Sequence, residues 1–217
     1  MGNKIRTLDL RGKRLSAVEI RDLLPRASLD IDQAAHQIRP MLDDIKSRGL
    51  AAVIEVSQKF DGFNPEPIFV AQKEIDDAVA QLDSSLRSAI EESIERVRKV
   101  SRATMPSNVA VSLGVGAEVS QRWQPIESVG LYVPGGRAVY PSSVIMNVVP
   151  AQVAGVKRLV VATPGQKDFG GRPHPTVLAT AGLLGITDVI NIGGPAAIAA
   201  FAYGLPQVKL EPVDMAT

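Results

Sequence analysis

Three apolar runs, each followed by a glycine turn, constrain the fold of this 217-residue chain more than any other feature. The turns contain residues 134, 164 and 194, so they recur at an interval of 30 residues. Helix-length apolar segments, Ser142–Val153 and Pro175–Leu184, lie between the turns. A strand, a glycine turn and a helix within about 30 residues form the βα unit of a parallel sheet. The runs that predict strands are Val129–Val133, Leu159–Ala162 and Val189–Ile192.

The same repeat predicts where a ligand would bind. The three runs are continuously apolar rather than alternating, which favours strands that are buried on both faces. Right-handed crossovers between parallel strands would place all three turns at one edge of the sheet. In open α/β sheets, ligands bind at this carboxyl edge.

A change of composition near residue 110 divides the chain into two parts. Residues 1–110 carry 17 basic and 17 acidic side chains, whereas residues 111–217 carry 7 and 6. Glycine rises from 4 to 14 residues across the same boundary. Apolar stripes with a 3.6-residue period, such as Leu86–Val100 behind a capping Asp83, predict amphipathic helices in the first part. We therefore expect an α/β protein with a helical region at 1–110 and parallel βα units at 111–217.

Charge and composition exclude several classes of protein. The formal net charge of +1 argues against a nucleic-acid partner held mainly by phosphate contacts. No stretch of about 18 apolar residues is present, so no membrane span is expected. The first residues lack the apolar core of a signal peptide. Without cysteine there is no disulfide, thiolate metal site or cysteine nucleophile. A cytoplasmic protein without nucleic-acid or membrane partners is the expectation.

The first turn carries the most informative residues. The run Gly130–Arg137 has the outline of a phosphate-binding loop, but Gly136 and Arg137 stand where Lys and Ser or Thr are required. A G-x-G-x-x-G fingerprint is also absent. Tyr132 remains, at a strand end beside a turn and a helix start. This arrangement suits an anionic or nucleotide ligand. The alternative is a tight βα turn with Tyr132 in the core.

No complete catalytic set can be read from the residues. The two histidines, His36 and His174, have no second histidine or carboxylate at a metal-ligand spacing. His174 stands between two prolines at an expected helix start, which favours a structural role. Near the end of the chain, Val208–Asp214 predicts the beginning of another strand. We therefore assign no catalytic residue and no metal ligand.

Longer motifs resemble a known family. The run V-G-L-Y-V-P-G-G at Val129–Gly136 is followed by Y-P-S-S-V at Tyr140–Val144. Together with four shorter segments they resemble histidinol dehydrogenase over essentially the whole chain. The shorter segments are Leu8–Gly12, Phe60–Gly62 and Asn191–Ala200, and Glu211–Met215 also matches.

The resemblance implies a cytoplasmic, homodimeric, zinc-containing enzyme of histidine biosynthesis. Members of that family oxidise L-histidinol to L-histidine through histidinal and use two NAD. Their N-terminal half has an incomplete Rossmann-like fold. By resemblance, residues 111–217 are therefore an incomplete Rossmann-like NAD-binding region that follows the helical residues 1–110.

Residue by residue, the resemblance transfers one cofactor contact. Tyr132 matches the tyrosine that contacts NAD, whereas Ala196 stands where the family has a second NAD contact, a glutamine. The family's zinc ligands, proton-transfer Glu and His, and substrate-binding residues would lie beyond residue 217. We therefore expect an N-terminal fragment that is inactive alone. The alternative, suggested by Ala196 and the early terminus, is a non-catalytic nucleotide-binding or dimerisation module derived from that family.

Overall fold

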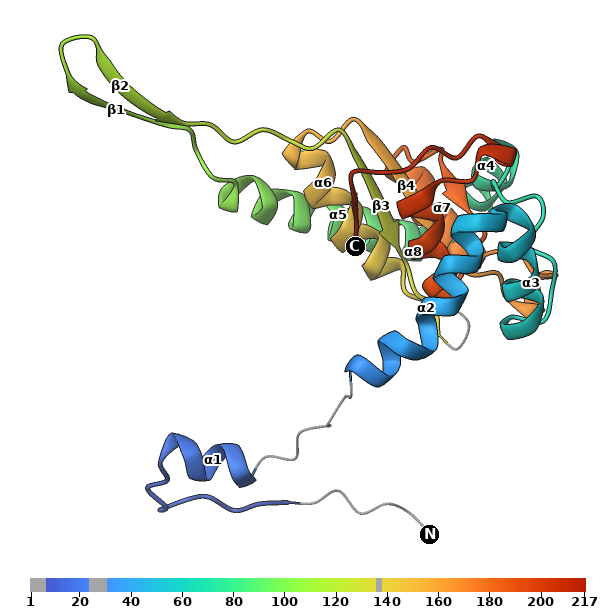
Figure 1. Ribbon diagram of the computed structural model, residues 1–217, viewed down its shortest axis with the longest axis horizontal. Helices are drawn as coiled ribbons and strands as arrows, with labels where there is room; N and C mark the ends of the chain where they lie inside the picture. The colour runs from blue at the N-terminus through green and yellow to red at the C-terminus, as the bar shows by residue number, and fades with distance from the viewer. Residues whose placement is uncertain (1–6, 24–30, 136–137) are drawn as a thin grey trace. The chain divides into compact units, whose positions relative to one another are not determined.

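The computed structural model describes residues 7–23, 31–135 and 138–217 (Figure 1). Gly136 and Arg137 of the first turn lie outside the described residues. The chain divides into two compact units, residues 1–37 and 38–217. No helix in the described ranges is both long and apolar enough to cross a membrane.

The N-terminal unit contains a short helix with a reciprocal cap. Helix α1 (Ala17–Leu23) follows Ser16, whose backbone N–H donates to the Glu19 carboxylate at 2.8 Å. The Glu19 N–H donates in turn to the Ser16 hydroxyl at 3.3 Å. These two bonds satisfy donors that a helix start leaves unpaired. Helix α2 (Ile31–Arg48) begins in this unit and continues through Pro40 into the second.

A four-stranded parallel sheet forms the centre of the second unit. Its strand order is β5-β4-β3-β6, and each neighbouring pair is parallel. Three strands coincide with the three apolar runs of the sequence, which confirms the predicted βα repeat. The strands are β3 (Ser128–Tyr132), β4 (Arg158–Ala162), β5 (Val189–Ile190) and β6 (Met215–Ala216).

Helices cover both faces of this sheet. Helix α6 (Pro141–Ala154) and helix α7 (Pro175–Leu183) connect β3 to β4 and β4 to β5. Helix α8 (Gly194–Tyr203) leads from β5 back across the sheet to β6. Because the direction of the crossover reverses after β5, right-handed connections place α8 on the face opposite to α6 and α7.

The charged first part of the chain supplies further helices to both layers. Helices α4 (Gln72–Ala80) and α5 (Ser84–Thr104) pack on the α6–α7 face, and α3 (Leu50–Phe60) packs with α8. Asp83 caps α5 by accepting the backbone N–H groups of Ser85 and Leu86, as the sequence predicts.

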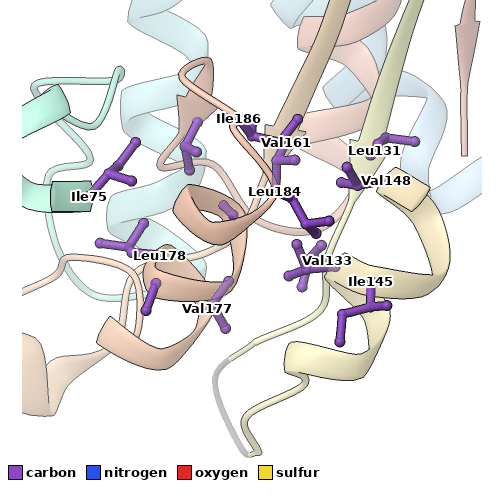
Figure 2. Packing of buried hydrophobic residues seen from close by; sticks show 14 of the residues in the cluster. Ile75, Leu131, Val133, Ile145, Val148, Val161, Val177, Leu178, Leu184 and Ile186 are labelled. Carbon is purple, nitrogen blue, oxygen red and sulfur yellow. The ribbon is translucent and has the colours of Figure 1, made fainter. Parts of the chain in front are cut away.

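Two apolar clusters fill the space on either side of the sheet. Val161 of β4 faces the α6–α7 layer, whereas its neighbours Val160 and Ala162 face the α8 layer. Figure 2 shows the first cluster, in which Leu131 and Val161 of the strands meet side chains of α6 and α7. Burial on both faces explains why the strand sequences are continuously apolar.

Two segments differ from the sequence-based expectations. Val208–Asp214 was expected to begin a strand, which is wrong, because Lys209 has a positive φ of 59° and the strand begins only at Met215. Before it, Pro206–Val208 forms a 3-10 helix. The chain also forms an antiparallel hairpin that was not predicted from the sequence, with β1 (Val109–Gly114) paired to β2 (Ala117–Gln121) and all of their residues exposed.

Candidate functional site at the carboxyl edge of the sheet

The three glycine turns meet at Pro164, at the carboxyl edge of the sheet. A methyl group added to Gly135 would lie 3.0 Å from Cγ of Pro164, and one added to Gly193 would lie 2.7 Å from its Cβ. The first and third turns therefore touch the second from either side. The predicted gathering of the turns at one edge is confirmed. A side chain at Gly193 would not fit, and one at Gly135 would require Pro164 to shift by a few tenths of an ångström.

Tyr132 ends β3 and connects the first strand to the third turn. Its hydroxyl accepts the backbone N–H of Gly194, the first residue of α8, at 3.1 Å. Its carbonyl oxygen accepts the Asn147 amide at 3.3 Å. The half-buried ring packs against the α8-side cluster. Tyr132 therefore lies at the carboxyl edge of the sheet and also packs against the core. Both positions that the sequence analysis considered for this residue, at a ligand edge and in the core, are present in the structure.

Asn191 lies beneath the edge, directly after β5, and is 1% exposed. Its side-chain amide donates to the carbonyl oxygens of Gly171, at 2.8 Å, and Pro65, at 3.3 Å. Two loops that are remote in sequence are thereby fixed to the strand end. Its Oδ1 has no hydrogen-bond partner among the described residues. Sequence reasoning did not single out Asn191, although an amide inside an apolar run is the kind of signal that could have found it.

Asp61 brings a carboxyl group close to the third turn. It follows helix α3, and its Oδ2 would lie 3.4 Å from a methyl group on Gly193. Burial raises the pKa of the Asp61 carboxyl above its usual value, because the ionised form loses hydration. Asp61 is thus the residue of the Phe60–Gly62 segment whose side chain reaches the carboxyl edge of the sheet.

The other residues considered from the sequence lie in structural positions. The His174 Nδ1 accepts the backbone N–H of Thr176 at 3.1 Å and so caps helix α7, which confirms the expected helix start. Burial lowers the pKa of His174, which favours the neutral ring that this bond requires. Ala196 is buried in the first turn of α8 within the apolar cluster, and His36 is exposed on α2.

The strand order identifies a crevice for a ligand. Counted in chain order, the sheet reads third, second, first, fourth, so the chain runs from β3 through β4 to β5 on one side and then returns to place β6 on the other side of β3. This is the switch point at which doubly wound sheets bind dinucleotides. Tyr132 stands there, and the backbone N–H of Tyr132 donates to Thr217, after β6, at 2.8 Å. The geometry therefore fits a nucleotide cofactor.

The described residues do not fit a metal ion. No group of three or more His, Asp or Glu side chains within the described ranges is placed to hold one. We therefore derive no chemical step through zinc from this part of the polypeptide.

Comparisons with known proteins agree on one family. The family model for histidinol dehydrogenase matches residues 24–217. The histidinol dehydrogenase of Mycolicibacterium smegmatis is 47% identical over 213 residues, which are 97% of this chain and 48% of that protein. The enzyme of Corynebacterium diphtheriae is 48% identical, with coverage of 98% and 49%. The crystal structure of histidinol dehydrogenase from Elizabethkingia anophelis superposes with a TM-score of 0.82 at 28% identity, covering 93% of this chain and 46% of that one. The chain thus spans about half the length of the curated relatives it matches.

Proposed function

Because this chain belongs to the histidinol dehydrogenase family, we propose that it forms the NAD-binding part of an enzyme that oxidises L-histidinol to L-histidine. The proposed enzyme is a cytoplasmic homodimer, and its zinc site and proton-transfer groups lie outside the residues described here. Histidinol dehydrogenase relatives are about twice as long as this chain, which is consistent with a site completed by other parts of the polypeptide.

The observation that carries the proposal is the position of Tyr132 at the switch point of the sheet. When bound, NAD supplies the hydride acceptor for each oxidation step. The Tyr132 ring offers an aromatic face to the cofactor, and a methyl group on Gly194 would meet no atom within 4 Å, so the backbone at the start of α8 is open to it. The Gly194 N–H bond to the Tyr132 hydroxyl fixes the side chain relative to α8.

Energetics predict that this chain alone binds NAD weakly. A dissociation constant of 1 mM already requires about −4 kcal/mol. An aromatic contact such as that of Tyr132 supplies roughly 0.5–1.5 kcal/mol beyond its burial. Other contacts must therefore come from the rest of the enzyme, and we expect the chain alone to be inactive.

A chimeric enzyme tests the proposal. This chain replaces the stretch that it matches in the Mycolicibacterium smegmatis histidinol dehydrogenase, and NADH formation from L-histidinol is followed by absorbance. The chimera is expected to form NADH, and the chain alone is not. A chimera that folds and binds L-histidinol but does not reduce NAD would contradict the proposal.

A further inference from the structure

The two outer edges of the sheet are covered unequally. At the β5 edge, the Val70 N–H donates to Val189 at 2.9 Å, and the Asn191 N–H donates to Ile68 at 2.8 Å. An extended segment of the same chain therefore covers that edge. At the opposite edge, β6 pairs only with β3 among the described residues. In Figure 1 the chain ends here, close to α6.

Helix α6 beside this open edge has the composition of a buried helix. It contains no charged residue over 14 residues, whereas helices on a protein surface carry charged or polar side chains on their outer face. Its exposed residues are Ser142, Met146, Pro150 and Ala154, spaced four residues apart, and three of the four are apolar. Helices α7 and α8 also lack charges, but five of nine and five of ten of their residues are buried, against four of fourteen in α6. The composition of α6 therefore indicates that another segment packs against its exposed face. The described residues do not supply this segment.

A groove of about 490 Å³ runs between α6 and β6. The buried side chains of Val129 and Leu131 form part of its wall. The largest exposed side chains around it are Met146 at 65%, Met215 at 51% and Ile126 at 39%. Exposed apolar side chains gathered in one groove mark an interaction surface.

The fold itself does not cover this groove when the sheet is extended. A strand added beyond β6 would extend the sheet in the same direction in which the chain moves from β5 to β6. Right-handed crossovers in that direction place the added helices on the face that α8 covers. The α6 face of β6 would stay open. A cover must therefore come from a part of the protein outside this βα pattern.

We propose that the α6–β6 groove is the docking surface for an apolar segment of the histidinol dehydrogenase polypeptide that this chain does not span. The inference rests on membership of that family rather than on the activity proposed above. Slightly more than half of each compared relative lies outside the match, so enough polypeptide is available. The groove lining is mostly apolar and uncharged, so the occupant presents leucine, isoleucine, methionine or phenylalanine side chains.

Methionine oxidation by hydrogen peroxide tests the proposal, because its rate follows the exposure of the sulfur. Mass spectrometry compares Met146 and Met215 in the chain alone and in the chimera, with Met105, the residue after α5 and 54% exposed, as the matched control. In the chimera, Met146 and Met215 are expected to oxidise about tenfold more slowly, and Met105 at an unchanged rate.

Three results would overturn the proposal. Equal oxidation rates of Met146 in both proteins would mean that the groove stays open. Equal protection of Met105 would mean general compaction rather than docking at this groove. Protection in the chain alone that rises with protein concentration would assign the groove to a second copy. Because this measurement needs no turnover, it can fail or succeed independently of the proposed activity.

A charged substitution gives a second measurement, made on both the chain alone and the chimera. Met146→Lys is expected to shift the Tm of the chain alone by no more than about 2 °C, since an exposed position tolerates charge. In a folded chimera the same substitution should lower Tm by more than the control Met105→Lys. A large loss of stability in the chain alone would show that Met146 is already packed, and would refute the open groove.

Discussion

Replacing Gly130 with alanine is expected to destabilise the sheet, although the backbone conformation of Gly130 does not itself require glycine. Gly130 is the central residue of β3, and α8 crosses directly over it. An added methyl group would lie 2.6 Å from Cδ1 of Phe201 and closer still to Cγ. Phe201 is fully buried, so its ring has no open space into which it can move. Overpacking of this kind costs about 1–3 kcal/mol.

A double-mutant cycle separates this clash from other effects of the substitution. Phe201→Ala alone should cost about 3–5 kcal/mol, because it leaves a cavity under α8. In Gly130→Ala/Phe201→Ala the methyl group has room, so the double variant should be more stable than the sum of the single effects by about 1–3 kcal/mol. Urea unfolding followed by circular dichroism gives the free energies of unfolding. Strict additivity, or a Gly130→Ala variant as stable as the parent, would refute the packing of α8 against β3.

Substitutions at three further positions test individual contacts. The stability that depends on the neutral His174 cap is expected to be present above pH 6.5, the unfolded pKa, and to fall as the pH drops from there toward the lowered folded pKa. His174→Asn, which keeps an acceptor for the Thr176 N–H, should remove this part of the pH dependence in thermal unfolding curves. Arg172→Lys should cost about 1 kcal/mol in urea unfolding, because lysine cannot reproduce the paired bonds to Glu74 at 2.9 and 2.8 Å; an unchanged midpoint would contradict this. Asp83→Ala should cost about 1 kcal/mol by the same assay, and Asp83→Ser much less, since serine also caps helices.

The sequence is informative where structure depends on local pattern. The 30-residue spacing predicts β3, β4 and β5, their turns and the helices between them, because burial on both faces requires continuous apolar runs. The Asp83 cap is equally local, since its acceptor and donors lie within three residues. Alternating valines around Gly114 and Gly116 are also typical of a hairpin such as β1–β2. The pattern is weak because neither face of this hairpin is buried, so its sequence does not have to separate apolar from polar positions.

Contacts between remote segments could not be predicted in this way. The Tyr132 hydroxyl meets Gly194 across 62 positions, and Asn191 reaches Pro65 across 126. Both depend on how α3 and α8 pack on the sheet, which no spacing in the chain encodes. The failed strand at Val208–Asp214 has a similar cause. The Arg158 guanidinium binds the carbonyl oxygens of residues 211 and 212, and Asp214 binds Ser128, so this segment is held by side chains rather than by a ladder.

The affinity of the chimera for NAD, measured by calorimetry for the parent and two variants at Tyr132, tests the central claim most directly. Tyr132→Phe keeps the aromatic ring and removes the bond to Gly194, whereas Tyr132→Ala removes both. If Tyr132 binds the cofactor, Tyr132→Ala should weaken NAD binding by about tenfold, or 1.4 kcal/mol, with the affinity for L-histidinol unchanged and a smaller loss in Tyr132→Phe. A folded Tyr132→Ala chimera that binds NAD as tightly as the parent would contradict the assignment of this edge as the cofactor site.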